Sequence, residues 1–434
     1  MRPSLLIGLY LLVCVLWPLA AQQPAPSGDP KQRIHQARDL GKQGPEALAK
    51  LQAMLSDPDA EVRIEAVKSI VAIDTKDSLD PLIQATRDSD PEMQIRSTDG
   101  LVNFYLPGYV QTGLTASLRR AGNAIKSRFT ETNGQTIPGY VQVRADVIAA
   151  LGKLASGGAS MDARANAARA IGILRGGAAI PDLVQALHSK DDDVIYESLN
   201  AIQKIRDPEA APRISFLLHD LNEKIQIAAI ETTGLLRNRE ALPQLRDVLE
   251  DRNSSVKVQR AALAAIAMIP DESSRPLYAR FLDDRDEGLR AAAAEGFGRL
   301  KNPADLPAVQ KKFEAEEKMP PRLSEAFALV DLGKTEMAQF SPLQYLIDTL
   351  NSKAWRGVAS AFLIELTRDA AIRRAAEEAT KTATKDERIG LAPILARSGG
   401  EDTLPYLEAL SHDSDSDIAE AALDALRTLK ARLP

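Results

Sequence analysis

The chain has very little cysteine and few aromatic residues. Its 434 residues include one cysteine, and Phe, Trp and Tyr together make up only 4% of them, although 44% are hydrophobic. A single cysteine excludes an intramolecular disulfide framework, so the fold must be held together by packing. Because rings are scarce, the apolar side chains are mainly aliphatic, which suits many thin helix-to-helix contacts better than one thick core.

Positive charge is also in deficit. The chain has 54 Lys and Arg residues against 60 Asp and Glu residues, which gives a net charge of −6. This balance argues against general nucleic-acid binding, which needs a basic surface. A long apolar run is missing too, because the stretch from Leu5 to Trp17 is shorter than the roughly 20 residues that a membrane-spanning helix needs.

The N-terminus has the pattern of a secretory signal. Arg2 precedes the apolar stretch, and residues 18–21 (PLAA) supply small residues for cleavage. We expect residues 1–21 to be a signal peptide and the mature protein to be exported, to the periplasm or outside the cell. An uncleaved signal acting as a membrane anchor is the alternative. Cys14 follows Val13 and lies in a poor lipoprotein box, and residues 22–30 (QQPAPSGDP) predict a flexible leader.

Prolines recur with a period of about 31 residues. Pro181, Pro212 and Pro243 are 31 residues apart, and so are Pro276 and Pro307. Proline is tolerated in the first turn of a helix, where its missing N–H has no partner to lose. Each of these prolines therefore predicts the start of a short helix, which we name helix A.

A second marker keeps step with the prolines. It is a small polar residue followed three positions later by an apolar residue, which is typical of a helix N-cap, and it predicts a second helix, helix B, in each repeat. Both markers shift together by two residues near residue 272, which chance proline spacing would not produce. The predicted caps are Asp59, Asp90, Ser160, Asp191, Asn222, Asn253, Asp286, Asn351, Asp386 and Asp415.

Helix B has an apolar face at helical spacing, as in Val62, Ala66 and Ile70. Neither helix of a pair can bury its apolar stripe alone, whereas stacking pair on pair buries it. We therefore expect residues 31–434 to form one all-α, right-handed α-α superhelix of about twelve helix pairs. Recurring glycines indicate close approach between neighbouring helices. They are Gly152, Gly172, Gly234, Gly296 and Gly298.

Stretches of helix B resemble a known repeat family. Residues 59–67 (DAEVRIEAV) and 162–174 (DARANAARAIGIL) are similar to HEAT repeats of the short bacterial type, the type also found in phycobilin lyases. The resemblance covers nearly all of residues 45–434. It implies a solenoid with helix B on the concave side, and it is unspecific for function because most such proteins are binding scaffolds with unrelated partners.

The period breaks at two places. Between residues 90 and 160 it is lengthened, and Pro-Gly-Tyr-Val-Gln occurs twice; residues 100–160 hold six basic residues against two acidic ones. We hypothesise a basic patch there that binds an anionic group or an acidic partner segment; a lengthened repeat with solvated charges is the alternative. At the second break, residues 318–321 (KMPP) predict a bend in the superhelix. The candidate patch residues are Tyr109, Arg119, Arg120, Lys126, Arg128 and Tyr140.

Residues with recognisable chemistry are mostly missing. There is no Gly-rich phosphate loop and no Ser-nucleophile motif. The four histidines lie in different repeats and none is followed by Glu, which disfavours a metal site. Residues 412–417 (HDSDSD) begin like a calcium loop, but Ile418 replaces the required glycine. We predict no catalytic, cofactor-binding or metal-binding residue. Trp355 is a candidate binding anchor, with core packing as the alternative.

Together these features favour an exported interaction scaffold that binds a protein or peptide along the solenoid surface. The alternative is a lyase- or hydrolase-type enzyme on a HEAT scaffold, with a pocket near residues 106–140. A DNA-processing HEAT protein is disfavoured by the export signal and the negative charge. Contact with a membrane is expected only through an uncleaved signal.

Overall fold

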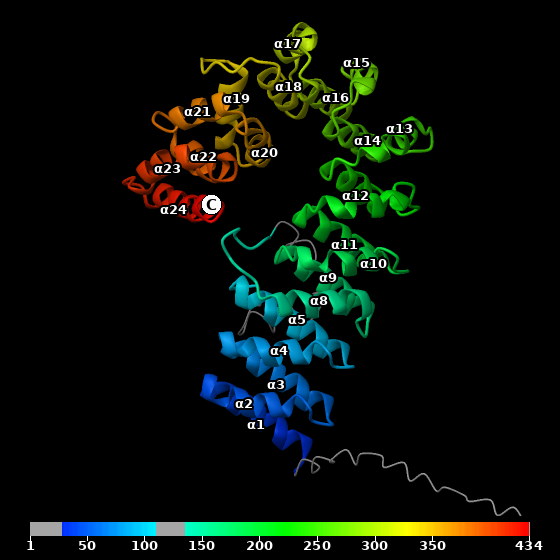
Figure 1. Ribbon diagram of the computed structural model, residues 1–434, viewed down its shortest axis with the longest axis vertical. Coiled ribbons are helices and arrows are strands. Elements are labelled where there is room, and N and C mark those ends of the chain that lie inside the picture. The colour runs from blue at the N-terminus through cyan, green and yellow to red at the C-terminus, as the bar shows by residue number, and fades with distance from the viewer. Residues whose placement is uncertain (1–27, 110–134, 434) are drawn as a thin grey trace, which may run out of the picture.

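The computed structural model describes residues 28–109 and 135–433, and every regular element in these ranges is a helix. The chain is an all-α, right-handed solenoid, as the sequence predicted (Figure 1). The predicted signal peptide and most of the leader lie outside the described residues. None of the described helices combines the length and the apolar character that a membrane span requires.

The helices alternate between a short outer helix A and a longer helix B. After α1 (Pro30–Gln43), which packs against the first helix B, the described residues hold eleven A/B pairs. Helix A is α2 (Leu48–Met54), α4 (Leu79–Ala85), α8 (Ala145–Gly157), α10 (Ile180–Ala186), α13 (Leu242–Glu250), α15 (Arg275–Phe281), α17 (Leu306–Ala315), α19 (Pro342–Asp348), α21 (Ala370–Ala379) or α23 (Leu404–Ser411), and in one repeat two 3-10 helices, η4 (Pro208–Arg213) and η5 (Ser215–Leu217).

Helix B of each pair stacks on helix B of its neighbours and buries the apolar face that the sequence indicated. In chain order these helices are α3 (Ala60–Ile73), α5 (Pro91–Tyr105), α9 (Met161–Ile173), α11 (Asp192–Ile205), α12 (Glu223–Leu235), α14 (Val256–Met268), α16 (Glu287–Leu300), α18 (Met319–Asp331), α20 (Arg356–Leu366), α22 (Lys385–Ser398) and α24 (Ser416–Lys430).

Most of the predicted caps are confirmed. Asp286, for example, accepts hydrogen bonds from the N–H groups of Gly288 at 3.0 Å and Leu289 at 3.1 Å. In three repeats the prediction was wrong by two to four residues, because a nearby side chain or an extra turn intervenes. The observed caps are Ser255 instead of Asn253, Thr384 instead of Asp386, and Trp355 instead of Asn351. Asn351 is the last residue of the 3-10 helix η9 (Thr349–Asn351).

The prediction for the prolines holds for most repeats and fails at Pro212. Six helices A carry proline at the first or second position, including Pro181 and Pro243. Pro212 instead lies inside the 3-10 helix η4, which begins at Pro208. An α-helix from Pro208 would require an N–H at residue 212, which proline lacks.

Close packing of neighbouring helices depends on the recurring glycines. Each of the five glycines noted in the sequence lies so near a neighbouring helix that an added Cβ would overlap its atoms. A Cβ on Gly234 would lie 2.7 Å from the Cα of Ala265 on the next helix B. Backbone atoms cannot step aside as a side chain can, so this stacking requires the missing side chain.

The solenoid forms a hook. In Figure 1, residues 30–300 make a long column, the chain turns over at α17 to α19, and α20 to α24 form a C-terminal arm that comes down to face the column near α11 and α12. The turn lies where the sequence predicted a bend. Pro320 and Pro321 occupy the first turn of α18, after Lys318, whose side chain makes no cap hydrogen bond.

Arg299 fastens this turn. Its side chain is only 7% exposed, and it bonds Glu365 of α20 at 2.9 Å and Glu295 of its own helix at 2.9 Å. Its guanidinium also lies over Phe327 of α18, whose ring stacks on Phe362 at 4.7 Å. Burial opposes the charge, but the two carboxylates raise the pKa of Arg299 above its usual value. One side chain thereby connects three successive repeats, through α16, α18 and α20.

Candidate binding surface

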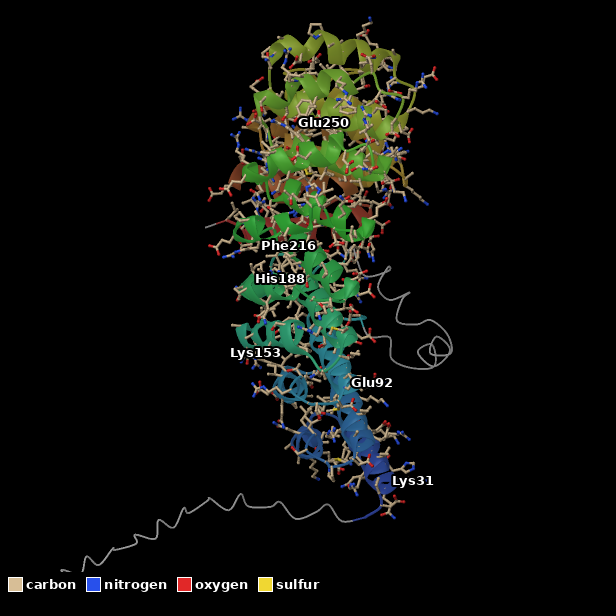
Figure 2. The ribbon with its side chains drawn as sticks, turned by 90° about the vertical axis from the view of Figure 1, so that its right-hand side faces the viewer. Lys31, Glu92, Lys153, His188, Phe216 and Glu250 are labelled. Atoms are coloured by element: carbon tan, nitrogen blue, oxygen red, sulfur yellow. The ribbon has the colours of Figure 1, made fainter. Side chains whose placement is uncertain are left out.

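The inside of the hook is lined by the C-terminal ends of helices B. Arg237, just after α12 in the column, forms an ion pair with Glu365, near the end of α20 in the arm, at 3.6 Å. The opposite, outer edge carries the ends of helices A and the starts of helices B. Figure 2 faces this outer edge and labels His188, Phe216 and Glu250 along it. The column and the C-terminal arm therefore contact each other through the C-terminal ends of their helices B.

Three successive helices B of the column are followed, within two residues, by an arginine with left-handed backbone conformation. Arg175, Arg206 and Arg237 have φ values of 49°, 61° and 53°. Glycine is the usual residue at such a helix end, and a residue with a side chain costs roughly 1 kcal/mol more there. A cation near a helix C-terminus is favoured by the helix dipole, which offsets part of this cost. Equivalent positions in stacked repeats place the three guanidiniums in a row.

The C-terminal arm adds arginines to the same region. Arg368 follows α20, and Arg397 lies in the last turn of α22. Burial and the positive charges of Arg397 and Arg206 lower the pKa of Arg175, so charges from both arms act on one guanidinium. Arg175 donates a hydrogen bond to the Thr136 hydroxyl at 3.3 Å. We name Arg175, Arg206, Arg237, Arg368 and Arg397 the arginine cluster.

One carboxylate, that of Glu365, is known to reach this cluster. Burial raises the pKa of Glu365, but the hydrogen bond from Arg299 and the charges of Arg299, Arg237 and Arg368 outweigh burial and lower it. Arg299 binds both oxygens of Glu365 and also Glu295, so this group of three side chains supplies one net negative charge beside the five arginines. Within the described residues, Arg206, Arg368 and Arg397 have no carboxylate at ion-pair distance. Among the described residues the cluster therefore carries more positive than negative charge.

The basic patch predicted from the sequence is only partly described. Arg119, Arg120, Lys126 and Arg128 lie outside the described residues. Tyr109 and Tyr140, which flank them, are both half-buried, and Tyr109 packs against the main core.

Arg144, from the same irregular segment, is already neutralised. It forms ion pairs with Asp80 at 2.6 Å and with Asp146 at 2.5 Å. These side-chain hydrogen bonds hold the pKa of Arg144 above its usual value. Part of the positive charge counted in residues 100–160 therefore serves to hold the start of α8 against α4.

Trp355 is half-buried at the start of α20 and packs against the main hydrophobic core. Its carbonyl accepts the N–H of Val358 at 3.0 Å, which fixes the backbone in the first turn. These contacts favour the core-packing alternative over a binding anchor.

The described histidines do not form a shared metal site. His188 is exposed and stacks on the half-exposed ring of Phe216, with centroids 4.6 Å apart, on the outer edge shown in Figure 2. In the part of the chain that the structure describes, no group of three or more His, Cys, Asp or Glu side chains is placed to hold a metal ion. A groove of about 780 Å³ on the outer edge is lined by charges of both signs, including Arg252, Asp284 and Arg285.

Only a weak pattern in the sequence indicates the cluster. Arg175, Arg206 and Arg237 recur at a spacing of 31 residues, but surface arginines at a repeat period are ordinary in solenoids. That Arg397 faces them is a consequence of the hook, which no local pattern reveals.

The fold defines an α-solenoid built from short helical hairpins. A family model described as HEAT repeats matches residues 20–101, 148–215 and 252–329, more than half of the chain. The chain therefore belongs to the HEAT-repeat family, as its sequence indicated. A comparison with curated proteins gives no significant match.

Many solved structures resemble the fold. YibA of E. coli is 14% identical with a TM-score of 0.40, and the match covers 71% of this chain and 99% of YibA. The CpcE–CpcF complex of phycocyanin lyase from a Nostoc species is 18% identical, with a TM-score of 0.31 and coverages of 73% and 93%. Kap121p bound to Pho4p is 11% identical, with a TM-score of 0.41 and coverages of 93% and 56%. Similarity this distant leaves the ligand of the present chain open.

Proposed function

We propose that this chain is an exported scaffold that binds a protein or peptide partner along the inner edge of its hook. The observation that carries the proposal is the arginine cluster, which draws charged side chains from five helix ends on both arms onto one extended edge. A small-molecule site is normally a closed, mostly apolar pocket. An extended charged edge that crosses several repeats suits a chain-like partner better.

Stacked hairpins support this function physically. Each repeat contacts only its neighbours, so the inner edge is continuous and its curvature is set by small rotations between repeats. Export is supported by the signal-like pattern of residues 1–21. The enzyme alternative, with a pocket near residues 106–140, gains no support from the described part of that segment, where Arg144 is paired with Asp80 and Asp146.

The test combines capture of a partner with mapping of its footprint. Tagged chain from the exported fraction is expected to begin at Gln22, which N-terminal sequencing checks. Hydrogen exchange of the chain with and without the captured partner is expected to slow at the turns after α9, α11, α12, α20 and α22. Protection confined to the outer edge, around Glu250 and Phe216, would contradict the proposal.

A second bait tests the irregular segment separately. It carries Arg119→Gln, Arg120→Gln, Lys126→Gln and Arg128→Gln together. If these residues form a binding patch, the variant loses a partner that the unmodified chain retains. Identical sets of captured partners would mean that the segment is a lengthened repeat only.

A further inference from the structure

We infer that the arginine cluster binds an extended acidic segment of the partner, with carboxylates on every third residue. The inference rests on the proposed function, because it names the chemistry of the partner at the same inner edge. It goes further in specifying charge, conformation and register.

Charge is the first observation. The chain as a whole has a net charge of −6, yet among the described residues only Arg237 of the five cluster arginines forms an ion pair, with Glu365 at 3.6 Å. Gathering like charges is unfavourable unless an anion compensates them. The lowered pKa of Arg175, caused by burial and by Arg397 and Arg206, reports this repulsion at one member of the cluster.

Helix dipoles alone do not account for the arrangement. They favour one cation at the end of each helix, which explains Arg175, Arg206 and Arg237 taken singly. The dipole of α22 likewise favours Arg397 taken singly. Dipoles do not explain why Arg397 of the arm and Arg175 of the column lie close enough for the charge of Arg397 to lower the pKa of Arg175, because the two cations repel each other. An anion lying between the two arms interacts favourably with both sets.

Spacing sets the register of the bound segment. Neighbouring packed helices lie about 8–10 Å apart, so successive arginines of the row are separated by about that step. A peptide in the extended polyproline II conformation rises about 3.1 Å per residue and has three residues per turn, so three residues cover one step and return the side chain to the same face. Carboxylates at positions i, i+3 and i+6 meet Arg175, Arg206 and Arg237 in turn. The guanidinium fork matches a carboxylate through two parallel hydrogen bonds.

The rest of the molecule selects against large polyanions. Outside the cluster the chain is still more negative than its net charge of −6, so a long nucleic acid or an anionic membrane would be repelled beyond the cluster. A short acidic segment fits within the positive region.

The experiment measures binding of a fluorescent peptide of repeated Glu-Gly-Ser triplets to the purified mature chain by anisotropy at low salt. A peptide of the same composition with consecutive glutamates tests the register, and a Gln-Gly-Ser peptide tests the charge. The variant is Arg206→Gln with Arg397→Gln, two side chains that have no ion-pair partner among the described residues. The matched control is Arg252→Gln with Arg285→Gln, two exposed arginines of the outer edge.

We expect the Glu-Gly-Ser peptide to bind the unmodified chain and the control equally, and to bind the cluster variant roughly tenfold more weakly. The thermal midpoint of the cluster variant should equal or exceed that of the unmodified chain, because repulsion is relieved. Equal binding to all three proteins, or no binding to any, overturns the inference. Equal binding of the consecutive-glutamate peptide overturns the register.

Binding of an inorganic polyphosphate chain tests whether the cluster is a phosphate site instead of a carboxylate site. If it binds more tightly than either peptide and its binding is lost in the same variant, the cluster is a phosphate site and the inference is wrong. These outcomes are separable from the proposed function. If the cluster variant still captures the natural partner, with unchanged protection of the inner edge, the inference about the arginine cluster is wrong but the proposed scaffold function is not contradicted.

Discussion

Glu325 of α18 offers the sharpest test of the energetics of this fold. Its side chain is fully buried, and neither carboxylate oxygen has a hydrogen-bond partner among the described residues. Burial, with a smaller contribution from Glu316, raises the pKa of Glu325 to about 8, against the opposing charges of Arg290 and Arg322. At neutral pH this carboxyl is therefore mostly protonated in the folded chain.

The pH dependence follows from the direction of the shift. In the unfolded chain a glutamate titrates at about 4.3, so between that pH and about 8 the folded state holds a proton that the unfolded state has released. Stability then falls as the pH rises, by at most about 1.4 kcal/mol per pH unit, and reaches its lowest level above the folded pKa. The whole loss amounts to a few kcal/mol, about 5 at the upper limit.

The substitution Glu325→Gln removes the titration while preserving the shape of the side chain. Relative to the unmodified chain, the variant should gain stability steadily from pH 5 to pH 8 and then level off. Urea unfolding followed by circular dichroism measures this difference. Hydrogen exchange of the α18 amides gives a local measure, because long repeat arrays need not unfold in one step.

Glu314→Gln on the neighbouring helix α17 is the control, since Glu314 is exposed. It should show no such slope. A constant difference between Glu325→Gln and the unmodified chain across the whole pH range would refute the reasoning, because it would mean that the buried carboxyl titrates like a solvated one.

Three further substitutions, the first with a matched control, test the packing, the hook and a cap. Gly234→Ala should lower stability by about 1–3 kcal/mol because its Cβ meets backbone, whereas Gly357→Ala, with nothing within 4 Å, should be neutral or stabilising by up to about 1 kcal/mol in thermal melts. Arg299→Ala strands the partly buried Glu365 and should cost about 3 kcal/mol; small-angle scattering should show a more open hook, and an unchanged profile would contradict its role. Thr384→Ala removes half of a capping box and should cost about 1 kcal/mol in urea unfolding.

The regular parts of the fold were predictable because they are encoded locally. A cap such as Asp286 and a proline such as Pro243 act within one turn of their own helix, so their positions along the chain predicted most helix starts. The predictions failed where two local solutions compete. Ser255 lies two residues after Asn253 and is equally able to cap a helix, and only the packed structure selects between them.

The candidate site was much less predictable. The basic segment around Arg119 drew attention because its composition departs from the rest of the chain, yet Arg144 within it is used to hold two repeats together. The arginine cluster has no such compositional signal, since its members are spread from residue 175 to residue 397.

By itself, the sequence determined the hairpin: where each helix begins, which face is apolar, and where a glycine such as Gly234 permits close stacking. Those features depend on interactions between residues at most one repeat apart. Only the tertiary structure decided that Arg397 faces Arg175 and that Glu365 reaches both Arg299 and Arg237. The physical reason is that the direction of a solenoid is the sum of many small rotations between repeats, so distant meetings depend on every interface along the way.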